Sequence, residues 1–373
     1  MYCKRVSVRN FRNIEQAEVC FSPGVNVLIG ENAQGKTNLL EAIFYASVGK
    51  SFRANHPADL IRFDTDFADI SLDYCDQSRD QNIRMRLFRD RQRQVEKNRV
   101  RVDKLSDIVG SFRAVLFCPE HLSLIKEGPA LRRNYMDVAI SRMYPLYMHS
   151  LQRYLHILKQ RNALIRDAWK NREIFDSTVE LWSMQLAQEA AVIAKYRSEF
   201  LLRVEKHVIN SFLEMTEEHE VPELIYQGSS KQTAEEYSDL KKTEEAYFSL
   251  LCGAHDREIA AGATLWGIHK DDVEIRLNGK NARIFASQGQ QRSLALALKL
   301  AEGEICLEEF GDYPVFLFDD VLSELDVHRR DYLVRQMRGR QVIMTACDPS
   351  AADFGGAVNL IRVDGGRYTQ REV

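Results

Sequence analysis

Hydrophobic and polar residues alternate along the start of the chain and again between residues 69 and 102. Alternation with a period of two is typical of half-buried strands, and it predicts strands at Lys4–Val8 and Ala17–Phe21 and an antiparallel meander over 69–102. The apolar run Val25–Ile29 ends at a glycine and predicts a buried strand. Helical spacing follows from Thr37 to Tyr45. The opening therefore predicts a sheet followed by a buried strand–loop–helix unit.

The middle of the chain changes to long, charged segments with helical spacing, at Ser150–Arg166 and Val179–Met215. We expect the two helices to pair as an antiparallel hairpin through Asp167–Ser177, since a short connection favours antiparallel neighbours. The polar stretch Tyr226–Thr243 predicts a loosely structured segment.

Strand patterns return towards the carboxyl end. Asn278-Gly279 between two short apolar runs predicts a hairpin with a type I′ turn. The remaining expected elements are strands at Val273–Leu277, Ala282–Phe285, Val315–Phe318 and Gln341–Thr345, and a helix at Gln290–Glu309. We therefore predict an α/β lobe I built from both chain ends, 1–118 and 265–373, with a largely helical lobe II, 119–264, inserted between them and no long coiled coil.

Composition narrows the class of protein little. The net charge is −3, so any nucleic-acid binding must use local basic patches. No stretch reaches the roughly 20 apolar residues of a membrane helix. The seven cysteines are scattered and form no C-x-x-C pair, which favours reduced thiols and argues against a cysteine metal site. We expect a cytoplasmic protein without a membrane partner.

One segment matches the phosphate-binding pattern G-x-x-x-x-G-K-[ST] in full: Gly30, Glu31, Asn32, Ala33, Gln34, Gly35, Lys36 and Thr37. Glycines let backbone N–H groups of such a loop point at phosphate oxygens, and the following helix adds its positive dipole end. Lys36 is expected to reach the β- and γ-phosphates of ATP, and Thr37 to ligate Mg²⁺. The alternative is a chance match in a glycine-containing turn, but the strand before the loop and the helix after it favour the nucleotide site.

The apolar strand Val315–Phe318 ends at Asp319 and Asp320. In P-loop proteins a strand of this kind carries the second half of the site. Asp319 is expected to hold Mg²⁺, and Asp320 to orient or deprotonate the attacking water. Many strands end at aspartate, so this pattern gains its meaning only together with the loop.

Two further segments define the order of motifs: Ser287-Gln288-Gly289-Gln290 before a helix, and Ser323-Glu324-Leu325-Asp326 after the acid pair. With the loop and the inserted helices, this order resembles the ABC-type ATPases. The resemblance implies that Ser287, Gly289 and Gln290 bind the γ-phosphate held by a second copy. Ser287 also suits a plain helix N-cap, and the two roles are compatible.

Asn10-Phe11-Arg12-Asn13 resembles SMC-type and DNA-repair heads. Several blocks are similar to the RecF family in particular: Gly49–Arg53, Pro119–Leu122 with Arg132-Arg133, Gly267–Asp272 and Phe318–Asp326. That resemblance implies a DNA-binding recombination mediator that acts at gaps and stalled forks, supports the SOS response, works with RecO and RecR, and dimerises with ATP. It also implies that Arg12 contacts the nucleotide.

Departures from the general ABC pattern indicate slow hydrolysis that serves as a switch. Asp320 stands where most members carry the longer Glu, and Thr345 takes the approximate place of the switch histidine. The Ser287 motif lacks the usual preceding Leu and double Gly. No glutamine lies near Leu116–Glu120 to fill the Q-loop role.

The predicted DNA contacts are Arg84, Arg86, Arg99 and Arg101, within a wider basic cluster in the meander that also holds Arg89, Arg91, Arg93 and Lys97. A solvated hairpin face explains the cluster equally well, and Asp90, Glu96 and Asp103 interrupt it. No sequence-reading motif is present, so binding should follow shape and phosphate. His269 has two candidate places, near a dimer junction or in a structural hydrogen bond, and the three tryptophans are expected to pack.

Three other classes of protein stay open. A transport ATPase subunit needs a membrane partner and a coupling surface, and the long charged insertion disfavours it. A small-molecule P-loop kinase predicts a monomer and leaves Ser287–Gln290 unexplained. A structural head that binds ATP without turning it over differs from a slow ATPase only in steady-state phosphate release.

Overall fold

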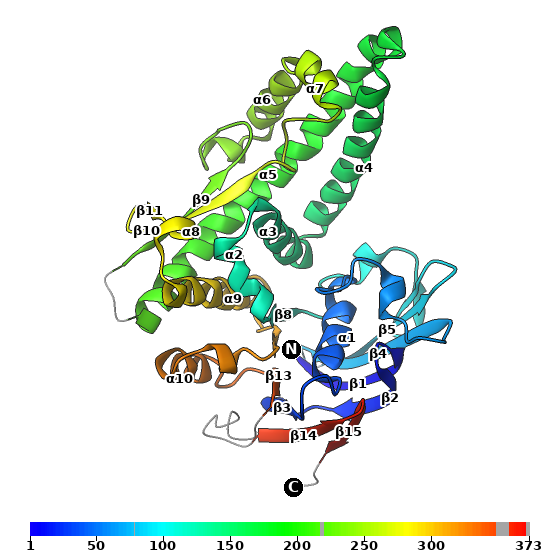
Figure 1. Cartoon of the computed structure of the whole chain (residues 1–373), viewed down its shortest axis with the longest axis vertical. Coiled ribbons are helices and arrows are strands. Elements are labelled where there is room, and N and C mark those ends of the chain that lie inside the picture. The colour runs from blue at the N-terminus through cyan, green and yellow to red at the C-terminus, as the bar shows by residue number, and fades with distance from the viewer. Residues whose placement is uncertain (78, 217–219, 348–357, 371–373) are drawn as a thin grey trace. The chain divides into compact units, whose positions relative to one another are not determined.

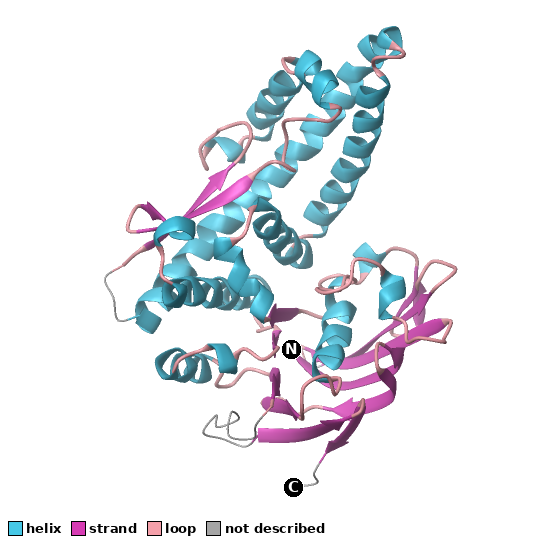
Figure 2. Ribbon diagram, viewed as in Figure 1, coloured by secondary structure: helices cyan, strands magenta, loops and turns pink. Residues whose placement is uncertain are grey.

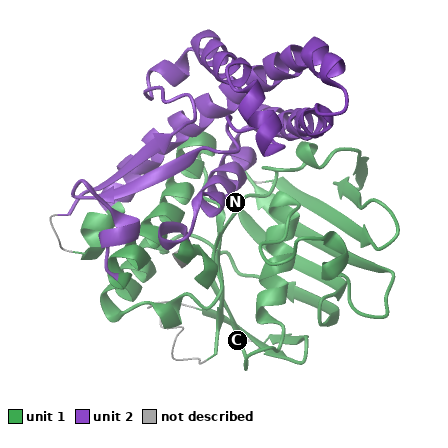
Figure 3. Cartoon of the chain, turned by 45° about the horizontal axis from the view of Figure 1, so that its top comes forward, with its two compact units in different colours: residues 1–123, 211–218, 288–373 green, residues 124–210, 219–287 purple. Residues whose placement is uncertain are grey.

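The computed structural model describes residues 1–77, 79–216, 220–347 and 358–370 (Figure 1). Its contacts divide the chain into unit 1, residues 1–123, 211–218 and 288–373, and unit 2, residues 124–210 and 219–287 (Figure 3). The later boundary lies after Ser287 rather than at the expected residue 264. The reason is strand pairing, because β10 (Asp272–Leu277) hydrogen-bonds to β9 (Pro222–Gln227) of the insertion.

Unit 1 contains an antiparallel six-stranded sheet with the order β2-β1-β4-β5-β6-β7. Its strands are β1 (Tyr2–Phe11), β2 (Ile14–Cys20), β4 (Phe67–Asp76), β5 (Arg79–Phe88), β6 (Gln94–Lys97) and β7 (Val100–Val102). Alternate residues are buried, such as Ile70, Leu72 and Tyr74 on β4. The predicted meander over 69–102 is therefore confirmed.

A second six-stranded sheet in unit 1 has the order β15-β14-β3-β13-β12-β8 and is parallel except for β15 (Figure 2). Its strands are β3 (Val25–Ile29), β8 (Ala114–Phe117), β12 (Val315–Phe318), β13 (Val342–Ala346), β14 (Val358–Asp364) and β15 (Arg367–Gln370). The apolar runs predicted at 25–29 and 315–318 match β3 and β12. Parallel strands bring their carboxyl ends to one edge of the sheet, and this edge carries the candidate site.

Helix α1 (Lys36–Val48) contacts strands of both sheets, including β1 and β4 of the first and β8 and β13 of the second. Nearly all of its side chains are buried, including the polar Lys36, Glu41 and Ser47, because the helix contacts both sheets. It ends at Gly49, whose φ of 68° is the left-handed conformation that favours glycine. Helices α9 (Gln288–Phe310) and α10 (Val327–Gln336) complete unit 1.

Unit 2 is mainly helical. Its helices are α3 (Pro129–Met143), α4 (Pro145–Asp167), α5 (Arg172–Thr216), α6 (Leu240–Cys252) and α7 (His255–Ala261), with α2 (Ser123–Lys126) at its start; the last residues of α5 count with unit 1. The Arg153–Glu189 ion pair and the hydrogen bond from Arg161 to Ser183 run between α4 and α5 in antiparallel order. The predicted helical hairpin is therefore confirmed.

A small sheet, β11-β10-β9, also belongs to unit 2. Asn278 and Gly279 have φ values of 50° and 72°, which confirms the predicted type I′ turn before β11 (Lys280–Asn281). The strand predicted at Ala282–Phe285 is wrong, because these residues form the one-turn helix α8. The Asn281 side chain accepts a hydrogen bond from the Arg283 N–H and so caps a helical turn where a strand was expected.

Among the described residues, no helix is long and apolar enough to cross a membrane. All cysteines are free thiols, and the described residues hold no group of three or more His, Cys, Asp or Glu side chains that could bind a metal ion. Trp182 and Trp266 are half-buried, but Trp169 is 76% exposed, so the packing role predicted for this tryptophan is wrong.

Candidate nucleotide-binding site

The loop Gly30–Gly35 connects β3 to α1, in the context that the sequence predicts. Gly30 passes so close to β14 that a Cβ atom there would lie 2.2 Å from the Val363 carbonyl oxygen. Gly35 has φ 114°, which L side chains rarely adopt. Glycine is therefore required at both positions by the close approach and by the backbone conformation.

Lys36 is buried and its Nζ turns back onto the loop, where it donates to the carbonyl oxygens of Gly30 and, at 3.0 Å, Glu31. The Cys347 Sγ lies 3.6 Å from the same amine and donates to Asn32 Oδ1 at 3.1 Å. The cation is thus held over the loop by neutral groups. A phosphate group is the ligand that such an amine and the N-terminus of α1 favour.

The last strands of the chain fix the backbone of the loop. Tyr368 OH donates to the Gly35 carbonyl oxygen at 2.9 Å, and the Gly366 N–H donates to the Gln34 carbonyl oxygen at 2.8 Å. A cavity of about 720 Å³ opens between the loop and β14. Sequence reasoning missed this support, since nothing in the pattern of residues 358–370 links it to residues 30–37.

The acid pair at the end of β12 faces α1. Thr37 Oγ1 donates to Asp319 Oδ1 at 2.7 Å, and Thr345 Oγ1 donates to the same oxygen at 3.0 Å. Burial raises the pKa of Asp319, against the lowering effect of the two hydroxyl groups. A buried carboxylate beside a hydroxyl offers the hard oxygen ligands that Mg²⁺ prefers, so these residues fit the metal.

Asp320 is exposed and has φ 52°, an uncommon conformation for a residue other than glycine. Its N–H donates to Thr345 Oγ1 at 2.8 Å, and its carboxylate accepts from Ser323 Oγ at 3.0 Å. Thr345 therefore holds both acids. In the sequence, Thr345 stands out only as the residue in the place of a switch histidine; its position near the carboxyl end of the buried strand β13 was the available signal for this role.

Arg12 lies in the turn between β1 and β2, with φ 54°. Its guanidinium forms two hydrogen bonds with the fully buried Glu41 of α1, at 2.9 and 3.0 Å. Next to it, Asn13 donates to the Ala33 carbonyl oxygen at 3.4 Å. The turn is thus tied to both the loop and its helix, and the nucleotide contact of Arg12 stays a prediction.

Helix α9 begins at Gln288, directly after the exposed Ser287. Arg292 of α9 donates to the Glu324 carbonyl oxygen at 2.8 Å and pairs with its carboxylate at 3.0 Å. Arg329 of α10 donates to Ser293 Oγ at 2.6 Å. These bonds join the first turns of α9, which follow the S-x-G-Q segment, to the S-x-L-D segment and to α10. The roles of Ser287, Gly289 and Gln290 themselves stay predictions.

The four arginines predicted to contact DNA differ in their surroundings. Arg84 and Arg86 both pair with Asp69, at 2.5 and 2.9 Å. Arg99 and Arg101 are exposed, in the β6–β7 turn and on β7. The first two charges are therefore neutralised in part by a carboxylate.

The P-loop after β3, the acid pair after β12 and the serine-led helix α9 define an ABC-type ATPase head. The sequence profile described as "RecF/RecN/SMC N terminal domain" matches residues 2–364. The protein called "DNA replication and repair protein RecF" from Bacillus cereus is 36% identical over 341 residues, which cover 91% of this chain and 90% of that protein. Its namesake from Clostridium novyi (strain NT) is 36% identical over 92% of both chains. The chain belongs to the RecF family.

Solved structures agree with this assignment. "Structure of the recombination mediator protein RecF-ATPrS in RecFOR pathway" describes a chain that is 31% identical, with a TM-score of 0.93 over 100% of this chain and 98% of that chain. The Smc head domain of Pyrococcus furiosus has a TM-score of 0.57 at 16% identity over 100% of this chain and 96% of that chain, which shows a shared fold. The predicted head fold and the resemblance to the RecF family are therefore confirmed.

Proposed function

We propose that this chain is an ATP-dependent DNA-binding protein of recombinational repair and replication-fork maintenance, with slow ATP hydrolysis as its switch. The arrangement of Lys36 over the loop, with Thr37 and Thr345 on the buried Asp319, carries the ATP part of the proposal. The DNA part rests on family membership, because the relatives are named as DNA replication and repair proteins.

In this proposal Lys36 and the amides of Gly30–Gly35 bind the phosphates of ATP, and Arg12 contacts the same nucleotide. Thr37 and Asp319 hold Mg²⁺, which when bound neutralises phosphate charge. Asp320 orients the attacking water. Its side chain is one methylene shorter than the glutamate of most ABC-type ATPases and accepts from Ser323, which supports slow hydrolysis.

We further propose that ATP joins two copies head to tail. Ser287, with the N-terminus of α9 at Gly289 and Gln290, binds the γ-phosphate held by the second copy, because a helix N-terminus favours an anion. Closure brings two phosphate-contacting surfaces onto one DNA, and this raises affinity steeply. Hydrolysis reopens the dimer. The proposed cellular setting is the cytoplasm, with RecO and RecR as partners in loading recombinase and with support of the SOS response.

Fluorescence anisotropy of a labelled gapped duplex tests the whole proposal. We expect Asp320→Asn to hold ATP without hydrolysis and to bind the DNA more tightly with ATP than without it. Binding should weaken steeply with salt, since basic side chains displace counterions. Equal binding with and without ATP, in protein shown to bind ATP, would contradict nucleotide-gated DNA binding.

The composite site has its own test. Ser287→Arg should leave ATP binding by the monomer unchanged and abolish the ATP-dependent dimer in sedimentation velocity. Ser177→Arg, the same change at an exposed serine of α5, is the control and should dimerise like the parent protein. Persistent dimers of Ser287→Arg would rule out this serine as a γ-phosphate ligand in trans. Steady-state phosphate release distinguishes slow turnover from a head that binds ATP only.

A further inference from the structure

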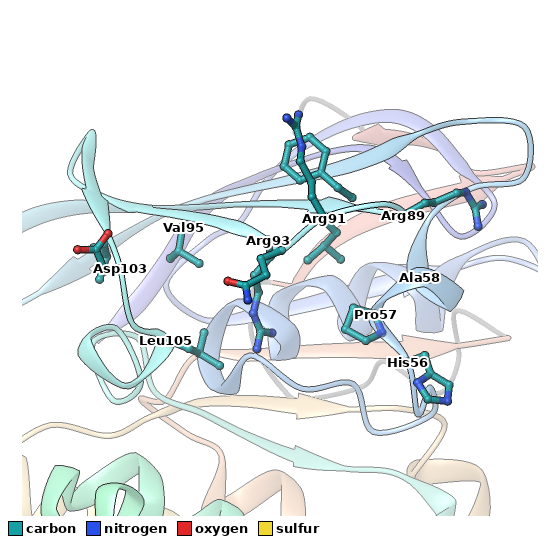
Figure 4. Close-up of a pocket in the computed structure, with 13 residues that line it drawn as sticks. His56, Pro57, Ala58, Arg89, Arg91, Arg93, Val95, Asp103 and Leu105 are labelled. Carbon is teal, nitrogen blue, oxygen red and sulfur yellow. The ribbon is translucent and has the colours of Figure 1, made fainter. Parts of the chain in front are cut away.

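Unit 1 has a cavity of about 590 Å³ on its antiparallel sheet, away from the loop Gly30–Gly35 (Figure 4). It lies between the short helix Pro57–Leu60 and the turn that connects β5 to β6. Its polar and charged lining consists of His56, Arg89, Arg91, Gln92, Arg93 and Asp103. Three of these side chains are arginines from one turn and its flank, which sets this cavity apart from the nucleotide site.

Arg89 is anchored by neutral groups. Its Nε donates to the Thr65 carbonyl oxygen at 2.8 Å, and its Nη2 donates to those of Arg62 and Ile61 at 3.0 and 3.2 Å. Backbone carbonyl groups orient a guanidinium but do not cancel its charge. The side chain is therefore fixed in place and remains a full positive charge at the surface.

Arg93 and Arg91 are also held in place by neutral groups. The Nη1 of Arg93 donates to Tyr45 OH at 2.8 Å and to the Gly49 carbonyl oxygen at 2.7 Å, both at the end of the P-loop helix α1. The guanidinium of Arg91 lies 3.9 Å from the centre of the Phe88 ring. Stacking on an aromatic face restrains this arginine and leaves its N–H groups directed outward.

The arginines of the neighbouring strand β5 differ from those of the cavity in their partners. Arg84 and Arg86, a few residues earlier on β5, share the carboxylate of Asp69. Among the described residues that line the cavity, the one acidic side chain is Asp103, and Figure 4 places it at the opposite end from Arg89. Arg84 and Arg86 on the strand are therefore paired with a carboxylate, whereas Arg89 and Arg93 in the cavity are bonded to neutral groups.

We propose that the backbone of DNA binds along this cavity and its rim, where Arg89, Arg91 and Arg93 point in different directions and so contact different phosphates (Figure 4). A guanidinium presents a planar fork of N–H donors that matches phosphate oxygens, and partial enclosure strengthens each charge-assisted hydrogen bond. The inference rests on the proposed DNA binding and assigns it to this cavity in preference to Arg84 and Arg86. Since Arg93 also bonds to the end of α1, the cavity and the ATP loop are attached to the two ends of one helix.

The test compares charge reversals in the full-length chain carrying Asp320→Asn, with ATP and labelled gapped DNA. Arg91→Glu is the main variant, because the Arg91 side chain is exposed and stacks on Phe88. Among the residues that it describes, the structure shows no hydrogen bond of this side chain whose loss would destabilise the fold. Arg79→Glu is the matched control, because it makes the same charge change at an exposed position at the other end of β5. ATP affinity, measured with a fluorescent analogue, checks that both variants are folded.

We expect Arg91→Glu to weaken DNA binding about tenfold or more and to lower the slope of log affinity against log salt by about one. Arg79→Glu should change affinity less than threefold. Equal losses in the two variants would show that bulk charge alone matters and would overturn the assignment. An unchanged Arg91→Glu would overturn it as well, while the parent's failure to bind DNA would instead contradict the proposed function.

Competition separates a polymer site from a site for free anions. Unlabelled duplex should displace the labelled DNA from the parent protein at concentrations where inorganic phosphate and tripolyphosphate, matched in ionic strength, do not. Displacement by tripolyphosphate at micromolar concentration, lost in Arg91→Glu, would show that the cavity is a site for a small anion and not for DNA.

Discussion

Two sets of buried charges, one in each unit, have opposite kinds of partner. In unit 2, Arg161 and Glu258 are both fully buried, and they bond to each other at 2.6 Å. The remaining donors of Arg161 reach Ser183 and Thr264, and the second oxygen of Glu258 accepts from the Leu265 N–H. Each charge there has an opposite charge and a set of hydrogen bonds, so the cluster serves the fold.

In unit 1, the buried Asp319 bonds to two hydroxyl groups, and Lys36 bonds to carbonyl oxygens. These partners orient a charge without cancelling it, and burial raises the pKa of Asp319 by more than the two hydroxyl groups lower it. Buried charged groups of this kind are typical of sites where a bound ligand supplies the missing opposite charge. The kind of partner, more than burial itself, therefore separates buried charges that stabilise the fold from buried charges that bind a ligand.

The largest expected effect is on stability in unit 2. Glu258→Gln removes the negative charge and leaves Arg161 buried without its partner, which should cost about 3–5 kcal/mol in the free energy of unfolding. Urea unfolding followed by circular dichroism measures it. The control is Asp176→Asn, which breaks an ion pair between two exposed side chains, Arg172 and Asp176, and should cost below ~1 kcal/mol. Similar losses in both variants would remove the distinction between the regions.

The second-largest expected effect is an increase in stability when the charge of Asp319 is removed. Its pKa is raised in the folded chain, so its charge destabilises the folded state at neutral pH, where the unfolded chain carries that charge at less cost. Asp319→Asn keeps an oxygen for Thr37 and Thr345, and should raise Tm by ~2 °C without nucleotide. The same variant should lose more than about tenfold in affinity for Mg²⁺-ATP.

Differential scanning calorimetry and a fluorescent ATP analogue measure these two effects. Asp320→Asn is the control, because Asp320 is exposed and its change should leave Tm unaltered. A lower Tm for Asp319→Asn would mean that the carboxylate stabilises the fold like Glu258, and the comparison would fail at this residue.

The elements that hold the site were predictable from sequence because each has a strong local cause. Four apolar residues and Asn26 before a glycine specify β3, and four apolar residues before an acid pair specify β12. The strand predicted at Ala282–Phe285 failed for a local reason too, since the capping side chain of Asn281 outweighs a short apolar run. Thus apolar pattern alone is reliable where burial is complete and weak where a polar cap competes.

Sequence patterns could not predict the contacts between residues that lie far apart along the chain. Thr345 bonds to Asp319 across neighbouring strands, and Tyr368 reaches Gly35 from a strand 333 residues away. The difference between Arg84, paired with Asp69, and Arg91, stacked on Phe88, depends equally on tertiary contacts. Spacing identifies charged residues, but only the fold shows which charges are already neutralised.

The smallest expected effect tests whether unit 2 also contains a group whose state depends on pH. His269 accepts from Tyr154 OH at Nδ1, 2.7 Å away, and donates from Nε2 to the Thr264 carbonyl oxygen at 3.1 Å, so it is held neutral. Burial, the largest cause, lowers its pKa to about 4, and the charges of Lys270, Arg133 and Arg161 act in the same direction. This places His269 in the structural role, one of the two that the sequence allowed.

At pH values between the ordinary histidine pKa and about 4, the unfolded chain binds a proton at His269, while the folded chain does not. Stability should therefore fall as pH is lowered through this window, by about 1 kcal/mol between pH 7 and 5.5. Urea unfolding across pH should show a shallower fall for His269→Gln and an unchanged one for His156→Gln, at an exposed histidine of α4. A parallel profile in His269→Gln would assign the fall to other groups. A shallower one would show that the core of unit 2, like the ATP site, contains a group whose charge state depends on what surrounds it.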